Sequence, residues 1–174
     1  KLDRTVSGMD ELCAPAKRLT QDDVMNSARV MLFGEDINQL SNTEEILSKN
    51  LNFIAKLDSG EEMLGLVTHV LNLKAVFVHR TFAEYFAACW FSKNYLSNLS
   101  YVRKLYLSGS FETVRMFFDR ISARENKLHT CVIICNTVEI TALLADNNTL
   151  IDELDCSGRT ALHLAVANFL NLLS

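Results

Sequence analysis

His79 is the residue whose type and position are best suited to chemistry in this sequence. A β-rich run from Ala75 to His79 passes into a segment of helical periodicity that begins at Phe82. An imidazole at this junction lies beside the first turn of a helix, where unpaired N–H groups and the helix dipole favour an anion. The pattern therefore predicts that His79 can contact a phosphate group. The structural alternative is a histidine that caps the helix or is hydrogen-bonded within its own domain.

Asp58 is a second candidate, in the string Asp58-Ser59-Gly60 that follows Leu57. It matches the D-[ST]-G string of aspartic proteases, in which two carboxylates share a proton. A chain with a single such motif would have to dimerise to supply the second carboxylate. The flanking segments fit a turn that enters a hairpin equally well, and the rest of the chain is too helical for that β-rich fold. The protease is therefore kept only as a minor alternative.

His129, Cys131 and Cys135 contain the right atoms for zinc but not the right spacing. Residues two apart on a helix point to different faces, so His129 and Cys131 would not converge on one ion. Cys131 and Cys135 fit core packing instead. No metal site is expected.

A phosphate-binding loop of the type G-x-x-x-x-G-K-[ST] is absent, because no glycine in the sequence is followed by lysine. Gly60 and Gly65 have the glycine spacing of such a loop, but Leu66 stands where the loop requires lysine. The carboxylate of Glu61 would also repel phosphate. The chain itself is therefore predicted to hold no cofactor and to hydrolyse no ATP.

The composition is that of an ordinary folded protein without an electrostatic preference for nucleic acid. Apolar residues make up 49% of the 174 residues, charged residues make up 22%, and the formal net charge is −4. Such a chain can fill a core and carries no positive excess for a nucleic-acid backbone. One basic cluster is interleaved with Glu112, Asp119 and Glu125, and it is interpreted as a solvated helix face; its members are Arg103, Lys104, Arg115, Arg120, Arg124 and Lys127.

The cysteines and the N-terminus both indicate an intracellular protein. The five cysteines are odd in number and lie mostly among apolar neighbours, which is typical of free thiols in a reducing compartment. The first residues, KLDRTVSGMDEL, contain no apolar segment of a signal peptide. No run has the apolar length that a bilayer span requires, so no membrane association is predicted. We expect a cytoplasmic protein and, because the chain begins with Lys1, a fragment of a longer one.

The elements that would position these residues are mostly helices. Residues 20–33 form a predicted helix with Thr20 as N-cap and Gly34 as its stop, and Ser41 or Asn42 opens a second helix in capping-box spacing. The runs 64–70 and 75–79 predict the one hairpin. An apolar stripe follows at helical spacing and is expected to be core; it contains Phe82, Tyr85, Phe86, Cys89 and Trp90. Behind Ser110 as cap, a further helix is expected to bury Val114, Phe117 and Phe118 among others, and shorter helices follow.

The most specific string in the chain is Phe77-Val78-His79-Arg80-Thr81-Phe82-Ala83-Glu84-Tyr85-Phe86-Ala87-Ala88. It resembles the F-x-H-x-x-F-x-E-[YF]-[FL]-A-A motif that ends the winged-helix region of NACHT-type signal-transduction ATPases, the class that includes NOD-like receptors. The match is closest to arthropod-style members whose sensor region is built from ankyrin repeats. The resemblance implies that His79 contacts the β-phosphate of ADP and helps to hold a closed, inactive state. That contact requires the nucleotide-binding domain, which this chain lacks.

The C-terminal part resembles ankyrin repeats. Leu128-His129 recurs as Leu162-His163 after 34 residues, close to the roughly 33 residues of that repeat. The second copy is similar to the signature D-x-x-G-x-T-P-L-H-x-A, with Ala161 in place of proline. The resemblance implies a structural role for the residues that match it, in which Gly158 permits the turn, Thr160 caps the helix, and Leu162 and Ala165 let neighbouring helices approach; the set is Asp155, Gly158, Thr160, Leu162, His163 and Ala165. In the first copy Arg124 stands at the turn glycine and Asn126 at the threonine.

Together these patterns predict a mainly α fold with one small β-hairpin. Residues 1–97 would form a winged-helix-like regulatory domain, and residues 98–174 a capping segment and ankyrin repeats of which the last is incomplete. The predicted function is to couple a protein-binding ankyrin array to a winged-helix latch in a nucleotide-switched signalling protein, whose parent could bind ATP or ADP. The chain itself would not be an enzyme, and its partners would be other proteins. The alternative is a plain ankyrin scaffold with an unrelated helical domain.

Overall fold

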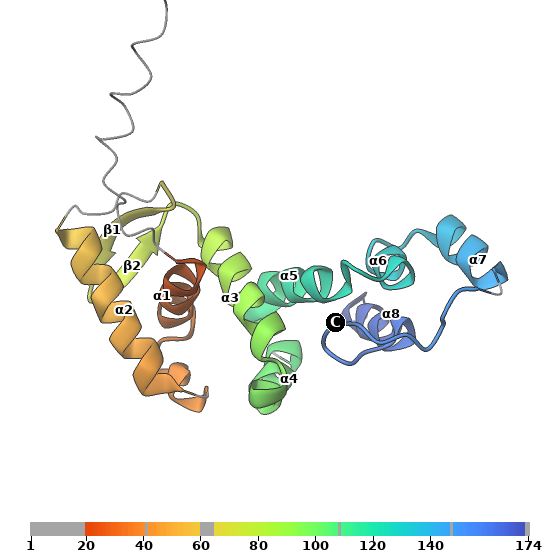
Figure 1. The fold of residues 1–174 in the computed structure, drawn as a ribbon, viewed down its shortest axis with the longest axis horizontal. Coiled ribbons are helices and arrows are strands. Elements are labelled where there is room, and N and C mark those ends of the chain that lie inside the picture. Colours follow the sequence, from red (N-terminus) through yellow and green to blue (C-terminus); the bar gives the residue numbers. More distant parts are fainter. Residues whose placement is uncertain (1–19, 41, 60–64, 108, 147, 173–174) are drawn as a thin grey trace, which may run out of the picture. The chain divides into compact units, whose positions relative to one another are not determined.

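The computed structural model describes residues 20–40, 42–59, 65–107, 109–146 and 148–172 (Figure 1). Within these ranges the chain is mainly helical and contains a single two-stranded antiparallel sheet, which confirms the coarse fold class predicted above. The α-helices and strands are α1 Gln21–Phe33, α2 Thr43–Asp58, β1 Val67–Leu71, β2 Lys74–Phe77, α3 Arg80–Asn94, α4 Leu99–Leu107, α5 Glu112–Ala123, α6 Lys127–Ile133, α7 Thr137–Ala145 and α8 Ala161–Leu172. Short 3₁₀ segments cover Gly34–Gln39, Leu96–Asn98 and Gly109–Phe111.

The chain divides into two compact units, and the division falls inside α3, between Ala83 and Glu84. The sequence patterns had placed a boundary later, after residue 97. The first unit contains the described residues up to Ile37 and those from Asn42 to Ala83, that is α1, α2 and the hairpin. The second contains the remainder of α3 and the helices that follow it.

Helix α1 begins as its sequence predicts. The Thr20 side chain accepts a hydrogen bond from the Asp23 N–H at 3.2 Å, and the Asp23 carboxylate accepts one from the Thr20 N–H at 3.1 Å. This reciprocal arrangement is a capping box, here with Asp in the place of the more common Glu. Gly34 ends the helix with φ of 49°, a value that a residue without a Cβ adopts at little cost.

Helix α2 begins at the predicted place but not by the predicted mechanism. Asn42 precedes the helix in the left-handed region, with φ of 61° and ψ of 35°, and its side chain makes no capping hydrogen bond. The expected capping box is therefore wrong for Asn42, and Ser41 lies outside the described residues. The Thr43 hydroxyl donates instead to the Ile37 carbonyl at 3.0 Å, which ties the start of α2 to the preceding 3₁₀ segment.

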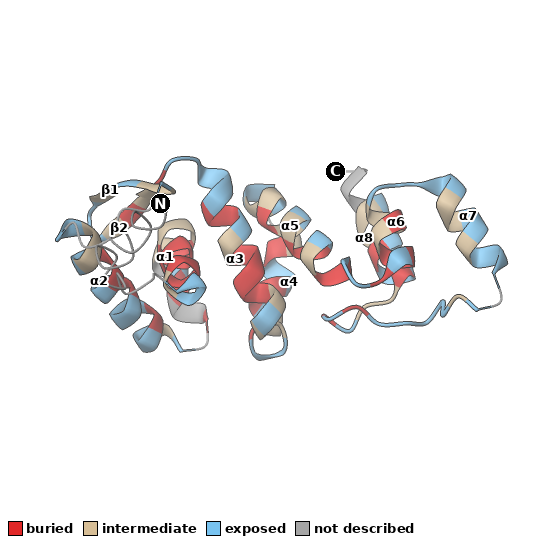
Figure 2. Ribbon diagram, turned by 45° about the horizontal axis from the view of Figure 1, so that its top comes forward, coloured by how far each residue is buried: buried red, intermediate tan, exposed pale blue. Residues whose placement is uncertain are grey.

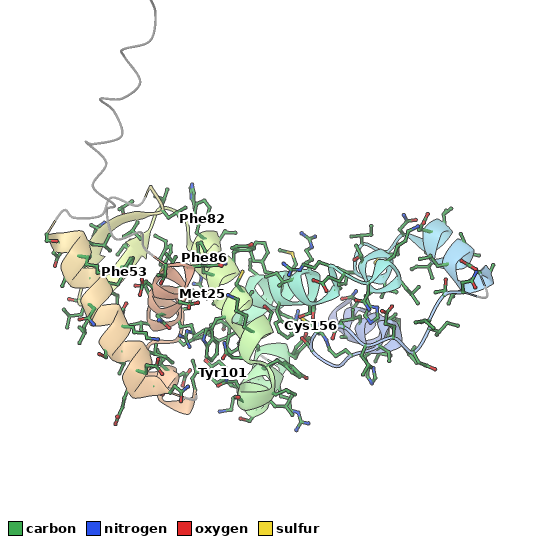
Figure 3. All side chains as sticks on the ribbon, in the orientation of Figure 1. Met25, Phe53, Phe82, Phe86, Tyr101 and Cys156 are labelled. Carbon is green, nitrogen blue, oxygen red and sulfur yellow. The ribbon has the colours of Figure 1, made fainter. Side chains whose placement is uncertain are left out.

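The core of the first unit lies between α1, α2 and β2, which pack against one another. Met25 on α1 and Phe53 on α2 are each 1% exposed (Figure 3). A buried polar bridge crosses this core, because Ser27 Oγ donates to Asn50 Oδ1 at 2.6 Å and Asn50 Nδ2 donates to the Leu73 carbonyl at 3.2 Å. Asn50 thereby joins both helices to the tip of the hairpin.

The hairpin is tighter than predicted, and its strands have different bounds. Leu71 pairs with Lys74, so only Asn72 and Leu73 form the turn, and both have positive φ, at 51° and 58°. This is the geometry of a type I′ turn, whose twist matches that of the flanking strands. Leu64, where the first strand was expected to begin, lies outside the described residues. Leucine at the second turn position hid the signal, because glycine is the usual residue there.

Helix α3 buries only part of the predicted aromatic stripe. Cys89 and Trp90 are buried, at 7% and 9% exposure, but Phe82 and Tyr85 are 38% and 40% exposed. The residues that the helix buries completely are Ala83, Ala87, Ala88 and Phe91. Three of these side chains are alanine, and small side chains let neighbouring backbones approach closely. A pattern that weighs only large apolar groups overlooks that face.

Aromatic rings join the helices of the second unit. Phe91 on α3 stacks on Tyr101 on α4, with ring centroids 5.9 Å apart. Helix α5 begins directly after Phe111, one residue later than the predicted cap Ser110 implies. Val114 and Phe118 are buried on α5 as expected.

Helices α6 and α8 pack against each other, and α7 packs on α6. None of the residues of α7 is buried, as the pale blue and tan ribbon of that helix shows (Figure 2). Among the described residues, no helix combines the length and the apolar character that crossing a membrane requires.

Candidate functional site

His79 is exposed at the junction between β2 and α3. The strand ends when the Val78 N–H donates to the Leu66 carbonyl at 2.9 Å, and the helix begins when the Phe82 N–H donates to the His79 carbonyl at 3.0 Å. The imidazole therefore precedes the first turn of a 15-residue helix. A side chain at this position is beside the N–H groups that a helix leaves unpaired at its start.

The closest described ring to the His79 imidazole is that of Phe82, with centroids 6.1 Å apart and planes at 38°. Phe82 is itself 38% exposed, so it forms an apolar edge beside the imidazole rather than a cover. The arrangement leaves His79 accessible to a group from outside its own unit. It can offer an N–H donor to an anion, which is the chemistry that the sequence predicted for it.

The repeat signature forms a closed turn before α8. Oδ1 of Asp155 accepts from the N–H groups of Ser157 at 2.8 Å and Arg159 at 2.9 Å, and the Asp155 N–H donates to the Arg159 carbonyl at 2.8 Å. Gly158 has φ of 73° within this turn, where a Cβ would be strained. Asp155 and Gly158 thus both shape the turn that precedes α8.

Thr160 and His163 contact each other at the start of α8. Nδ1 of His163 accepts from the Thr160 N–H at 3.0 Å and lies 2.8 Å from the Thr160 hydroxyl. Because Nδ1 accepts the backbone bond, the proton of a neutral imidazole resides on Nε2. The His163 residue as a whole is exposed.

Leu162 and Ala165 do not pack as expected. Leu162 is 72% exposed and Ala165 is also exposed, whereas Ala161 and Leu164 are buried at 5% and 1%. The face of α8 that contacts α6 is therefore Ala161 and Leu164. The expected face of Leu162 and Ala165, together with Val166 and Phe169, is exposed to solvent in this chain.

The candidate zinc ligands do not converge, and the candidate protease carboxylate lies on a helix. His129 is 1% exposed and uses Nε2 to donate to the Arg159 carbonyl at 2.9 Å. Cys131 is buried and Cys135 is exposed. No group of three or more potential metal-binding side chains occurs in the part of the chain that the structure describes. Asp58 is the exposed last residue of α2 and not part of a β loop.

A buried ionic cluster is the feature that the sequence reasoning missed. The Arg159 guanidinium contacts the Asp119 carboxylate and the Tyr106 hydroxyl, and the Tyr106 O–H donates to Asp119. Its Nε donates to Oδ2 of Asp155 at 3.0 Å. Asp119 was assigned to a solvated face, but it is 5% exposed, so that interpretation is wrong for this residue. No local spacing on α5 distinguishes Asp119 in the sequence, because its partner Arg159 lies 40 residues away.

Two carboxylates, those of Asp119 and Asp155, face one guanidinium in this cluster. Burial works against the charged form of Arg159, but Tyr106, Asp119 and Asp155 together outweigh it and raise the pKa of the guanidinium. Burial and then Asp119 raise the pKa of Tyr106, although Arg159 opposes them. The cluster therefore contains a charged arginine and a neutral phenol. It can hold helices together, but it presents no reactive group to a substrate.

The two candidate regions thus have different chemistry, an exposed imidazole in the first unit and a buried structural cluster in the second. Comparison of the chain with protein-family models, with curated proteins and with solved structures gives no match in any of the three.

Proposed function

We propose that this chain is the regulatory and protein-binding part of a nucleotide-switched signalling protein, in which repeat-like helices are coupled to a winged-helix-like latch. The observation that carries the proposal is the exposed position of His79 at a strand–helix junction. A phosphate from a neighbouring domain can reach an imidazole there, and the adjoining helix start adds favourable electrostatics. Had the imidazole been buried, the latch would have no contact to make.

The hairpin supports the same proposal over the alternative of a plain repeat scaffold. Residues 67–77 form two strands and a turn, whereas a continuous helical array would have helices there. A winged helix combines helices with such a hairpin.

The second unit supports the protein-binding part of the proposal. His129 and His163 are 34 residues apart, and His129 already bonds across to the Arg159 carbonyl at 2.9 Å. The exposed apolar side chains of α8, together with the exposed His163, offer a surface of the same kind for further repeats; these side chains include Leu162, Val166 and Phe169. Stacking of such units buries faces that a single unit leaves exposed.

The test is an ADP dissociation measurement on a longer protein that joins this chain to its nucleotide-binding domain. His79→Ala should raise the ADP off-rate about tenfold or more, the value of a hydrogen bond to a charged group, and should raise basal activity. His69→Ala is a matched control, because His69 is also exposed but belongs to β1. Unchanged ADP off-rates in the His79 variant, or equal changes in the His79 and His69 variants, would count against a contact between His79 and ADP. Either result would favour the plain scaffold.

A further inference from the structure

The connection between α7 and α8, residues 146–160, is held in place by polar contacts. Its described apolar side chains face solvent, with Leu150 70%, Ile151 54% and Leu154 57% exposed. Its buried residues, among those described, are Asp155 and Ser157, each 4% exposed. A segment held by apolar burial tolerates small shifts, whereas hydrogen bonds and ion pairs depend on distance and angle. The connection is thus fixed in one arrangement by geometry-sensitive contacts.

These polar contacts converge on the C-terminal end of α5. The Ser157 and Ser122 hydroxyl oxygens are 2.9 Å apart in a buried pair, and the Cys156 N–H donates to the Ser122 carbonyl at 3.5 Å. Cys156 lies just before α8 in sequence (Figure 3). Asn126, directly after α5, donates from Nδ2 to the Leu154 carbonyl at 3.4 Å.

Arg159 is at the centre of this contact. Its guanidinium lies 5.0 Å from the centre of the Phe118 ring, pairs with Asp119 on α5 and with Asp155, and donates to the Tyr106 hydroxyl on α4. Its carbonyl accepts the hydrogen bond of His129 on α6. One residue of the connection therefore contacts three helices and its own turn. The side chain of Arg159 is only 13% exposed, so these contacts are little weakened by solvent.

The same part of α5 contacts α3 and the residue after it. The Phe118 ring that Arg159 covers also stacks on Tyr95, with centroids 5.8 Å apart, and the neighbouring Phe117 ring meets Tyr85 edge to face at 5.5 Å. A continuous series of contacts thus leads from the α7–α8 connection through α5 to α3. Interlocked contacts of this kind make elements open and close together.

We propose that Arg159 is a conformational latch that makes the α7–α8 connection, α5 and α3 one cooperative unit. Release of Arg159 from Asp119 removes the central contact between the connection and α5 and loosens the Phe118 contact, so a change imposed on the connection is transmitted to α3. The inference rests on the proposed function only for the purpose of this coupling, since α3 is the helix that follows His79. The coupling itself does not depend on that proposal. Its test requires no nucleotide and no partner protein.

The experiment is native-state hydrogen exchange on the whole chain, comparing wild type with Arg159→Lys, Asp119→Asn and the double variant. Lysine keeps the charge but loses the planar fork that reaches several partners at once. Each single variant should lower the protection of amides in residues 155–160, in α5 and in residues 85–94 of α3 by a common factor, on the order of a hundredfold. The double variant should lose less than the sum of the two single losses, because the two changes share the Arg159–Asp119 interaction.

A milder variant keeps the test decisive if these changes unfold the chain. Tyr106→Phe removes one hydroxyl from the cluster and should lower protection of the same three regions together by about fivefold. Lys127→Gln is the control, because the Lys127–Glu139 pair at 2.5 Å is exposed, and it should change protection by less than about twofold.

Loss of protection confined to residues 155–160, or losses that add in the double variant, would overturn the proposal for Arg159. Neither outcome bears on ADP release from the longer protein, so the proposal for Arg159 and the proposed function of His79 can fail separately.

Discussion

Leu73 illustrates how one residue can be held in a backbone conformation that its side chain disfavours. Its φ of 58° is in the left-handed region, where a Cβ meets the carbonyl oxygen, at a cost of roughly 1–2 kcal/mol. The side chain is 63% exposed, so its own burial offsets little of this cost. The hydrogen bond from Asn50 to the Leu73 carbonyl and the strand pairing on either side hold the turn in place.

Replacement of Leu73 by glycine should therefore stabilise the first unit. Glycine adopts positive φ without the steric cost, although its freedom in the unfolded chain removes part of the gain. We expect an increase of about 0.5–1 kcal/mol in the free energy of unfolding, measured by urea denaturation. Leu51→Gly is a suitable comparison, since Leu51 is 49% exposed within α2, and it should cost about 1 kcal/mol. A loss of stability in Leu73→Gly would show that the turn is not strained.

At the scale of elements, α5 and α7 differ in what surrounds them, since α7 is the more apolar helix and yet buries none of its residues. Val114 on α5 is fully buried, whereas Val138 on α7 is 80% exposed. Helix α7 has nine residues, a length at which an isolated helix is marginal in water. It packs on α6, and the exposed Lys127–Glu139 pair adds little.

The two valines form a matched pair for a truncation test. Val114→Ala removes buried methyl groups and leaves a cavity, so it should lower the free energy of unfolding by about 2 kcal/mol. Val138→Ala should change it by no more than about 0.5 kcal/mol, because little surface leaves water at that position. Thermal or urea denaturation of both variants decides the matter. A similar cost for both would mean that α7 is packed in solution.

At the scale of the whole chain, the buried phenol of Tyr106 makes stability depend on pH. Burial and Asp119 raise its pKa above the ordinary value of 10. The folded chain therefore keeps the phenol proton at pH values where the unfolded chain releases it. This stabilisation is complete below pH 10 and is lost as the pH rises beyond that value.

Tyr106→Phe should consequently weaken the alkaline loss of stability. Wild type should show a falling melting temperature between about pH 9 and about pH 11, and the variant a shallower fall over the same range. At neutral pH the variant should be less stable by about 1 kcal/mol, because it lacks the hydrogen bonds of the hydroxyl. Circular dichroism melts across this pH range provide the measurement. If the melting temperatures of the two proteins fall in parallel as the pH rises, buried Tyr106 is not the cause of the alkaline loss of stability.

The sequence alone predicted the features that depend on local chemistry. Helix α1 begins after Thr20 and ends at Gly34, Gly158 allows the turn before α8, and the Thr160 N–H bonds to His163. Each of these effects involves residues only a few positions apart. The strand–helix junction at His79 was predicted for the same reason. The coarse fold, helices with one small hairpin, follows from such local signals added along the chain.

Only the tertiary structure decided which faces are covered and which charges are paired. The alanine face of α3 is buried while Phe82 and Tyr85 are exposed, because burial depends on the neighbour that approaches and not on the size of the side chain. In the sequence Asp119 is one of several charged residues in its helix. In the structure it forms an ion pair with Arg159, which lies 40 residues later, in the turn before α8. Periodicity describes one helix at a time, whereas an ion pair of this kind exists only when two distant segments are brought together.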